Sequence, residues 1–218
     1  MFHFHDVDIL LKLAACDLLR DLDELLAVSP ADVKVLETAI FKIRSLGKKG
    51  IYTERVISQA IRFCEGHDEI PSLQSTTAAD ALTSLGAGMD AGEVILFSSA
   101  LENAASRVVT GDKRALRMLG KLGKEHDLVR NLQGRVVCFE ELLLRTFEAH
   151  GFDYLCKHSH AGADHDGLLR LAFRSGLATE QSEALEGIHS AWRALNRESS
   201  GLLVDRFVPG KQSENIPY

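Results

Sequence analysis

Three acidic side chains stand where carboxylates could act together on a metal ion. Asp6 follows residues 2–5, which alternate apolar and polar side chains as a short strand does. Asp112 follows a second apolar run, and Glu93 stands near the start of a helical pattern that precedes this run. Because parallel strands end at one edge of a sheet, we expect these acids to converge there. Mg²⁺ and Mn²⁺ favour sites made of oxygen ligands, so the predicted chemistry is metal-assisted.

The same acids fit a second interpretation, in which they cap helices. Asp90 stands three residues before Glu93, and this pair has the spacing of a capping box. Carboxylates near a helix N-terminus also favour the positive end of the helix dipole. The spacing alone therefore leaves a metal site and helix caps open as alternatives.

Positioning these acids requires strands and helices that alternate along the chain. Apolar runs between polar breaks predict strands at residues 2–5, 106–110 and 135–139. Helical periodicity predicts helices at residues 9–15, 18–26, 35–47, 54–63, 78–85, 91–104 and 113–119, and a mainly helical chain from residue 140 onward. This alternation is typical of an α/β fold with a mostly parallel sheet.

Three segments are expected to interrupt the regular structure. Residues 66–76 are polar and contain Pro71, which predicts a loop. Residues 86–88, with two glycines, are expected to end the preceding helix. The stretch after Ser199 contains Gly, Pro and polar residues and is expected to fray.

Taken in order, the acidic motifs resemble the PIN domain, a metal-dependent nuclease family found in many toxin–antitoxin ribonucleases. In that family the first strand runs into an acid and an apolar helix start, and residues 6–12, DVDILLK, look similar. A second acid sits in an early helix, as Glu37 does within residues 35–38. A third opens the helix before the fourth strand, and residues 90–96, DAGEVIL, are similar. The fourth is the Asp of a Thr-x-Asp turn, which residues 108–114, VVTGDKR, resemble closely.

This resemblance, which covers approximately residues 1–140, implies a fold, an activity and a cofactor. It implies a three-layer α/β/α, PIN-like nuclease domain at residues 1–147, followed by a helical C-terminal extension at residues 148–218. The implied activity is hydrolysis of RNA phosphodiester bonds by a cytoplasmic ribonuclease, such as the toxin of a toxin–antitoxin pair. The implied cofactor is Mg²⁺ or Mn²⁺, held by Asp6, Glu37, Glu93 and Asp112, with Asp90 as a further ligand.

Basic and hydroxyl side chains beside the acids are the candidates for substrate contact. At the Thr-x-Asp turn, Thr110 could bond a ligand or a water molecule. Three cations lie near the acids in sequence and could meet phosphate oxygens, although solvated helix faces explain them equally well: Lys12, Lys113 and Arg114. The densest basic stretch is a further candidate for contact with an RNA strand and contains Lys42, Arg44, Lys48 and Lys49.

Two positions depart from the PIN pattern and support other functions. Val7 stands where the family has a hydroxyl residue, and Asp8 replaces its Asn or Ser. Loss of the hydroxyl removes a hydrogen bond that orients metal ligands. The alternative is therefore a catalytically impaired PIN-like protein that binds or regulates through its C-terminal helices. An antitoxin, another protein or a second copy of the chain would then contact the apolar face made by Leu168, Leu169, Leu171 and Phe173.

Histidine clusters suggest two further sites, for which packing is the favoured interpretation. His3 and His5 form a His-x-His pattern similar to that of metal-dependent amidohydrolases, whose barrel needs about 250 residues. We expect one of them to pack and the other to line the rim of the acidic site. A second cluster has zinc-ligand residues, but a polar inter-helix loop with Asp164 as a helix cap is favoured there: Cys156, His158, His160, Asp164, His165 and Asp166.

Composition sets limits on the class of protein. The 218 residues carry 31 acidic and 25 basic side chains, so the formal net charge is -6. This charge excludes a strongly basic coat for bulk nucleic acid, whereas a small metal-bridged phosphate site remains compatible with it. The four cysteines lie far apart without a Cys-x-x-Cys pair, which indicates reduced thiols in the cytosol. No apolar run reaches the length of a membrane span, so no membrane partner is expected.

Overall fold

Five parallel strands form the centre of the protein. The computed structural model describes residues 1–85 and 89–204. Within them the strands are β1 (His3–His5), β2 (Val33–Val35), β3 (Asp68–Glu69), β4 (Arg107–Thr110) and β5 (Val136–Cys138). They form one sheet in the order β3-β2-β1-β4-β5, and every neighbouring pair is parallel. The expected α/β fold with a parallel sheet is confirmed, and it is compatible with layers of helix, sheet and helix.

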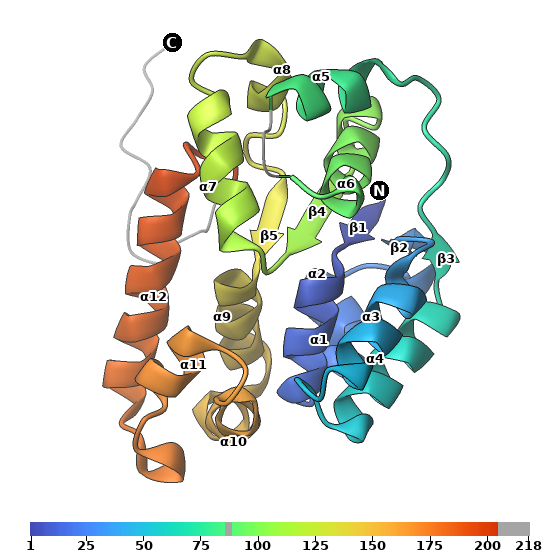
Figure 1. Cartoon of the computed structure of the whole chain (residues 1–218). Coiled ribbons are helices and arrows are strands. Elements are labelled where there is room, and N and C mark those ends of the chain that lie inside the picture. The colour runs from blue at the N-terminus through green and yellow to red at the C-terminus, as the bar shows by residue number, and fades with distance from the viewer. Residues whose placement is uncertain (86–88, 205–218) are drawn as a thin grey trace, which may run out of the picture.

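Helices surround the sheet and extend beyond its carboxyl end. The α-helices are α1 (Val7–Ala15), α2 (Leu22–Leu26), α3 (Ala39–Lys48), α4 (Glu54–Glu65), α5 (Thr77–Leu85), α6 (Ala91–Glu102), α7 (Lys113–Leu122), α8 (Asp127–Arg130), α9 (Phe139–His150), α10 (Phe152–Gly162), α11 (Gly167–Ala172) and α12 (Gln181–Glu198). Short 3-10 helices are η1 (Leu19–Asp21), η2 (Pro30–Asp32) and η3 (Gly176–Ala178). Figure 1 shows α1 and α9 continuing beyond the carboxyl ends of β1 and β5. None of the described helices is both long enough and apolar enough to cross a membrane.

The strand order creates a topological switch point between β1 and β4. The chain moves from β1 outward to β2 and β3, and then returns to the other side of β1 with β4 and β5. All three residues of β1 are buried, as expected for a central strand. Open α/β sheets bind their ligands outside the carboxyl ends of the strands at such a switch point. Asp6 follows β1 directly, and only Gly111 separates β4 from Asp112.

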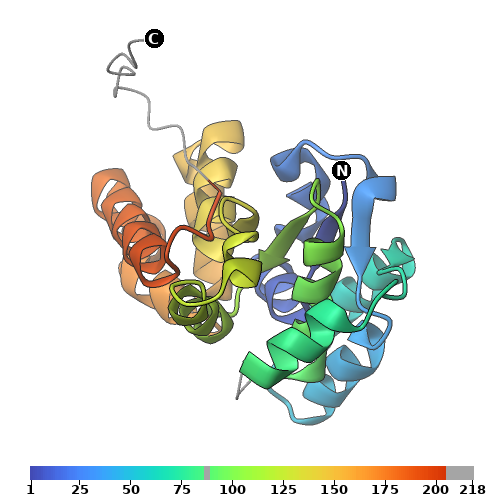
Figure 2. The same cartoon turned by 90° about the horizontal axis from the view of Figure 1, so that it is seen from above.

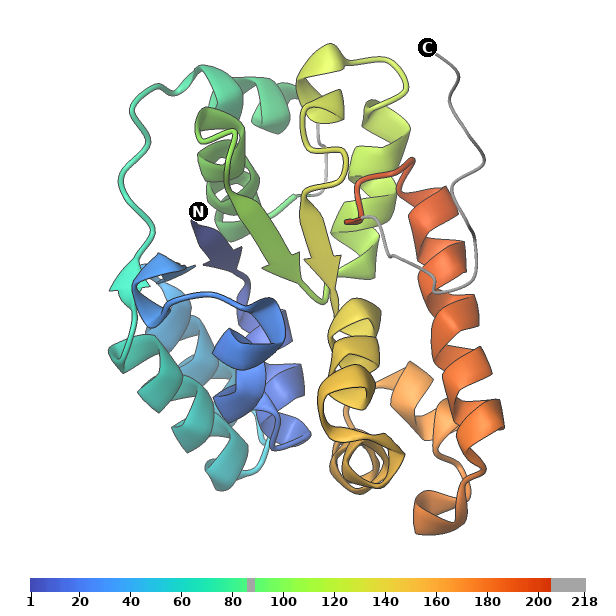
Figure 3. The same ribbon diagram turned by 180° about the vertical axis from the view of Figure 1, so that it is seen from behind.

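The helices pack on the sheet and then on one another. Helix α6 packs on β1 and β4, and α1 also packs on β4. The view from behind shows β4 and β5 in front of α6 and α7, so these two helices cover the same face of the sheet (Figure 3). On the N-terminal side, α1, α3 and α4 contact one another. The packing of α6 on β1 and β4 brings the start of α6 to the carboxyl ends of these two strands.

The C-terminal helices form a group beside the N-terminal half. Helix α9 follows β5 and continues past residue 147 to His150. Helix α12 packs on α7, α9 and α11, and the view from above shows the orange and red helices opposite the blue N-terminal part (Figure 2). Within the predicted apolar face, Leu169 and Phe173 are buried in the chain, whereas Leu171 is exposed.

Two strands differ from the sequence prediction, while the strands predicted near residues 2–5, 106–110 and 135–139 are confirmed. Strand β2 extends into the start of the predicted helix at residues 35–47, which begins instead at Ala39. Val33 and Val35 are β-branched and buried, and three residues are too few for periodicity to separate a strand from a helix. Strand β3 lies in the predicted loop and consists of two exposed acids that give no apolar signal.

The segment after Ser199 corrects a further prediction. Leu203 forms a parallel bridge with Val136 of β5, and residues 202–204 are buried. The expected fraying is therefore wrong for this part of the chain, because apolar side chains dock on the sheet edge. Residues 205–218 and the predicted helix stop at residues 86–88 lie outside the described residues.

Candidate functional site

A pocket with a volume of about 260 Å³ lies at the switch point. Its wall includes Asp6 from the end of β1, Asp90 and Glu93 from the start of α6, and Asp112 after β4. Asp8, in the first turn of α1, also lines it. The structure therefore brings together four of the five acids expected as metal ligands, which come from three separate parts of the sequence.

Asp6 is held by the threonine of the Thr-x-Asp turn. The buried Thr110 hydroxyl donates a hydrogen bond to Asp6 Oδ2 at 3.0 Å, and the same oxygen of Thr110 accepts one from the Asp112 backbone N–H at 3.1 Å. Burial, followed by the nearby Asp8 carboxylate, raises the pKa of Asp6 to about 6. Thr110, expected to bond a ligand or water, thus links two of the acids to each other.

Asp90 and Glu93 form the capping box that their spacing predicted. The Asp90 side chain accepts from the Glu93 backbone N–H at 2.8 Å, and the Glu93 side chain accepts from the Asp90 N–H at 2.8 Å. Asp112 caps α7 in a similar way, because its Oδ1 accepts from the N–H groups of Arg114 and Ala115. The acids are therefore helix caps and pocket-lining groups at the same time.

Glu93 and Asp112 interact directly in the pocket. Burial, followed by a hydrogen bond with Asp112, raises the pKa of Glu93 to about 7. Burial acts in the same direction on Asp112, but N–H donors and the Glu93 side chain outweigh it and lower the pKa of Asp112. Burial therefore favours the protonated form of Glu93, whereas the N–H donors favour the ionised form of Asp112.

Two cations line the acidic pocket. The Lys42 ammonium lies 3.0 Å from Asp90 Oδ2, and the Arg114 guanidinium lies 3.7 Å from Glu93 Oε1. The Arg114 side chain is 73% exposed, so it can swing toward a ligand at small cost. Lys42 comes from the basic stretch expected to contact RNA, whereas Arg44, Lys48 and Lys49 of that stretch are exposed and lie outside the described lining.

Glu37 is the expected ligand that the structure separates from the others. It is exposed in the turn between β2 and α3, and it lines a different pocket together with Leu36 and Ile70. The helix predicted at residues 35–47 is present from Ala39 onward but begins after Glu37, because β2 extends through Val35. Lys42 of α3 lines the acidic pocket, and Glu37 is not among the described residues of that lining.

Lys12 and Lys113 are not among the described residues that line the pocket, and both form ion pairs. The Lys12 ammonium contacts Asp8 at 2.9 Å, Asp166 at 3.4 Å and the Gly111 carbonyl at 3.1 Å. Lys113 forms an ion pair with Glu140, which is buried at the start of α9. Lys12 therefore ties the turn before Asp112 to the C-terminal half of the chain.

The Lys12 contacts lead to a test of stability. Lys12→Met is expected to lower the free energy of unfolding by about 3 kcal/mol, because it leaves a buried carboxylate without its cation. Lys48→Met, which changes an exposed lysine on α3, should alter it by less than about 0.5 kcal/mol. Urea unfolding at neutral pH measures both values. Equal effects of the two substitutions would show that the Lys12 contacts contribute no net stability.

The histidines of β1 are buried in the sheet. Burial lowers the pKa of His3 to about 4, and burial together with the neighbouring His3 holds the pKa of His5 well below its usual range. Neither imidazole forms a hydrogen bond with any of the residues that the structure describes. The His5 ring stacks on the Phe63 ring. The expectation that one of them lines the rim of the site is wrong, because both residues of this central strand are covered.

The second histidine cluster is spread over separate contacts. His158 Nδ1 lies 3.0 Å from the Cys16 carbonyl oxygen, and the His165 ring stacks on Tyr52. Asp166, and not Asp164, caps α11 through the N–H groups of its first turn. Within residues 1–85 and 89–204, no three His, Cys, Asp or Glu side chains, those of the acidic pocket included, are grouped so that they could hold a metal ion without first rearranging.

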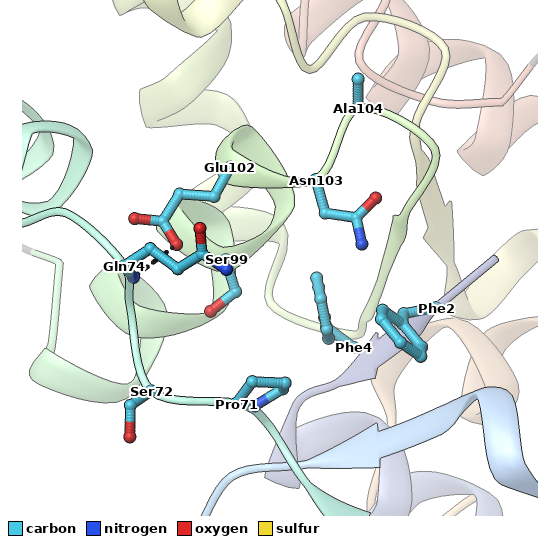
Figure 4. Close-up of a pocket in the computed structure, with 9 residues that line it drawn as sticks. All are labelled: Phe2, Phe4, Pro71, Ser72, Gln74, Ser99, Glu102, Asn103 and Ala104. Carbon is cyan, nitrogen blue, oxygen red and sulfur yellow. Dashed lines mark hydrogen bonds between the residues drawn. The ribbon is translucent and has the colours of Figure 1, made fainter.

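Another pocket, of about 270 Å³, lies at the opposite end of the sheet. Phe2, Phe4 and Asn103 line it near the amino ends of β1 and β4 (Figure 4). Among its described lining residues Glu102 carries the charge, and that carboxylate accepts from the backbone N–H groups of Gln74 and Ser75. The acidic pocket is therefore the better candidate for chemistry.

No family model matches the chain, and neither a curated protein nor a solved structure matches it.

Proposed function

We propose that the protein is a PIN-like, Mg²⁺- or Mn²⁺-dependent phosphodiesterase that cleaves RNA. The observation that supports this proposal most strongly is the meeting of Asp6, Glu93 and Asp112 in one pocket at the switch point of the sheet. Each acid comes from a different element, so no single helix cap explains their meeting. The position is the one at which open α/β sheets bind ligands.

The donor chemistry of the pocket suits a divalent cation. All three acids supply hard oxygen donors, and burial is the first cause of the raised pKa values of Asp6 and Glu93, which Lys42 offsets only in part for Asp6. The carboxylates of Glu93 and Asp112 accept hydrogen bonds from N–H groups at helix N-termini. Both side chains must therefore turn before they can bind an ion together. When bound, such an ion would lower the pKa of a water molecule and stabilise charge on the phosphate.

The remaining groups of the pocket have roles that follow from their contacts. Thr110 orients the Asp6 carboxylate through its hydroxyl hydrogen bond. Lys42 and Arg114 would exchange their carboxylate partners for non-bridging phosphate oxygens, which bind cations well.

Cleavage of a labelled single-stranded RNA tests this function. The purified protein is assayed with Mn²⁺ and with EDTA, beside an Asp6→Asn, Asp112→Asn double variant. Asp127→Asn, which changes an exposed acid of α8, is the matched control. The proposal predicts metal-dependent cleavage that the double variant loses and the control keeps. Equal cleavage by the wild type and the double variant would overturn it.

A second candidate is a PIN-like binding or regulatory protein without catalysis. It is favoured by the ion pairs of Lys42 and Arg114 with the acids, which are arranged as a self-neutralised cluster. Its C-terminal helices, with Leu171 and Leu177 exposed, would then contact an antitoxin, another protein or a second copy. Calorimetric titration with Mn²⁺ separates the candidates. Tight binding that Glu93→Gln abolishes argues against this one, and absence of binding heat supports it.

A further inference from the structure

The acidic pocket has a second part that the proposed hydrolysis does not use. Beside the carboxylates and cations, its wall contains Leu11, Leu46, Ile51 and Tyr52. Ile51 is 50% exposed although it is apolar, and Tyr52 is half-buried. A charged end next to an apolar and aromatic end is the arrangement that suits a nucleotide, which carries a phosphate and a flat base.

Tyr52 is held in place from the other half of the chain. Its ring stacks on the His165 ring, with 4.7 Å between the ring centroids and 26° between the planes. Burial, followed by the Asp8 carboxylate, raises the pKa of Tyr52, so the phenol stays neutral and presents a flat ring without charge. The loop between α3 and α4 thus presents an aromatic side chain that is already ordered.

The support behind Tyr52 is rigid. His165 is followed by Asp166, whose Oδ1 accepts from the Leu168 and Leu169 N–H groups at 2.8 and 3.3 Å. The other carboxylate oxygen of Asp166 lies 3.4 Å from the Lys12 ammonium. The residue that follows His165 is therefore anchored by a helix cap and an ion pair, and an ordered aromatic platform loses little entropy when it binds a ligand.

We propose that Tyr52, backed by His165, is a stacking platform for a nucleobase next to the acidic pocket. This inference rests on the proposed function and assigns its substrate class as single-stranded RNA, because a base must leave its helical stack before an aromatic ring can contact its face. Lys42 and Arg114 would hold the neighbouring phosphate, and Ile51 would contact the edge of the base.

Fluorescence anisotropy with two labelled oligomers in EDTA tests the platform without cleavage. One oligomer is a short single-stranded oligouridine, and the other has the same length and backbone but lacks bases. Tyr52→Ala is expected to weaken binding of oligouridine by about 10-fold, and Tyr52→Phe to change it by less than about twofold. Neither substitution should alter binding of the abasic oligomer. Tyr52→Leu, which keeps apolar volume in the pocket, should resemble Tyr52→Ala.

Phe41→Ala is the matched control, because Phe41 is an aromatic residue of α3 that is 71% exposed and lies outside the described lining of the pocket. This variant should bind both oligomers as the wild type does.

The inference would be overturned if Tyr52→Leu weakened the binding of both oligomers equally or of neither. It would also be overturned if the wild type did not bind oligouridine more tightly than the abasic oligomer. If Asp6-dependent cleavage occurs while these variants bind normally, the platform fails and the function stands. If cleavage is absent but the base-dependent loss is seen, the function fails and the platform stands.

Discussion

Asp6→Asn is expected to lower Mn²⁺-dependent RNA cleavage by about 100-fold or more, whereas Glu37→Gln should change the rate by less than about twofold. Asp6 is buried at the switch point and lines the pocket with Glu93 and Asp112. Glu37 is exposed in a turn and lines a different pocket. Both acids belong to the set implied by the PIN resemblance, but only Asp6 lines the acidic pocket. The two variants therefore test whether activity depends on position in the pocket or on membership of the sequence motif.

Initial rates at saturating Mn²⁺ measure this contrast, with circular dichroism as the check on folding. The size of the Asp6 effect follows from the loss of a metal ligand, since Lewis-acid stabilisation is worth several kcal/mol and each 1.36 kcal/mol is about tenfold in rate. A large loss in Glu37→Gln would contradict the site described above. An unchanged rate in Asp6→Asn would contradict the role of its carboxylate.

In the metal-free protein, Asp6 and Glu93 are expected to make the free energy of unfolding fall as pH rises from about 4 to about 7. Their pKa values in the folded protein are about 6 and about 7, above the ordinary 3.8 and 4.5. The folded state therefore binds their protons more tightly than the unfolded chain does. This stabilisation is complete below the unfolded pKa and is lost as pH passes the folded pKa. For Asp6 it is on the order of 3 kcal/mol.

Thermal unfolding in EDTA at about pH 5 and about pH 7.5 measures this effect in the wild type and in Asp6→Asn. Asn cannot ionise, so the variant does not lose this stability as the pH rises. The Tm of the variant minus that of the wild type should therefore be about 5 °C larger at about pH 7.5 than at about pH 5. Comparison with the variant is needed because Asp112, with a lowered pKa, has the opposite dependence. Mn²⁺ should raise the Tm of the wild type at the higher pH and leave the variant unchanged. Parallel profiles of the two proteins would contradict the burial of an ionisable Asp6.

The acids at the strand ends are the part of the site that sequence could predict. Asp6 and Asp112 follow apolar runs that read as strands, and parallel strands end at a common edge. The Asp90–Glu93 spacing predicted a capping box, which the structure confirms. These features are local, or follow from a simple rule of sheet topology, so a single sequence is enough to find them.

Glu37 shows where the sequence signal fails. The sequence predicts that Glu37 lies in an early helix at residues 35–47, yet Val33–Val35 forms a buried strand next to β1 and the helix begins at Ala39. A three-residue strand has no periodicity of its own, and its conformation is determined by a neighbour that is distant in sequence. The two exposed acids of β3 give no apolar pattern either, so their pairing depends on the same tertiary contact.

The contacts between the two halves of the chain could not be predicted from the sequence. Lys12 and Asp166, like Tyr52 and His165, are far apart in the sequence and meet only in the folded protein. His165 belongs to a cluster of zinc-ligand residues for which a polar loop is the favoured prediction, and its observed partner is the Tyr52 ring. An exposed apolar residue beside an aromatic one, Ile51-Tyr52, was the available signal for this part of the pocket.

Crystals soaked in Mn²⁺ test the central claim most directly, because manganese scatters anomalously and can be located without assumptions about activity. We predict a Mn²⁺ peak bounded by the carboxylates of Asp6, Glu93 and Asp112, with Lys42 and Arg114 turned away from the acids they now contact. A soaked crystal that shows Mn²⁺ elsewhere, or none, with these ion pairs intact would contradict the claim that the pocket is a metal centre.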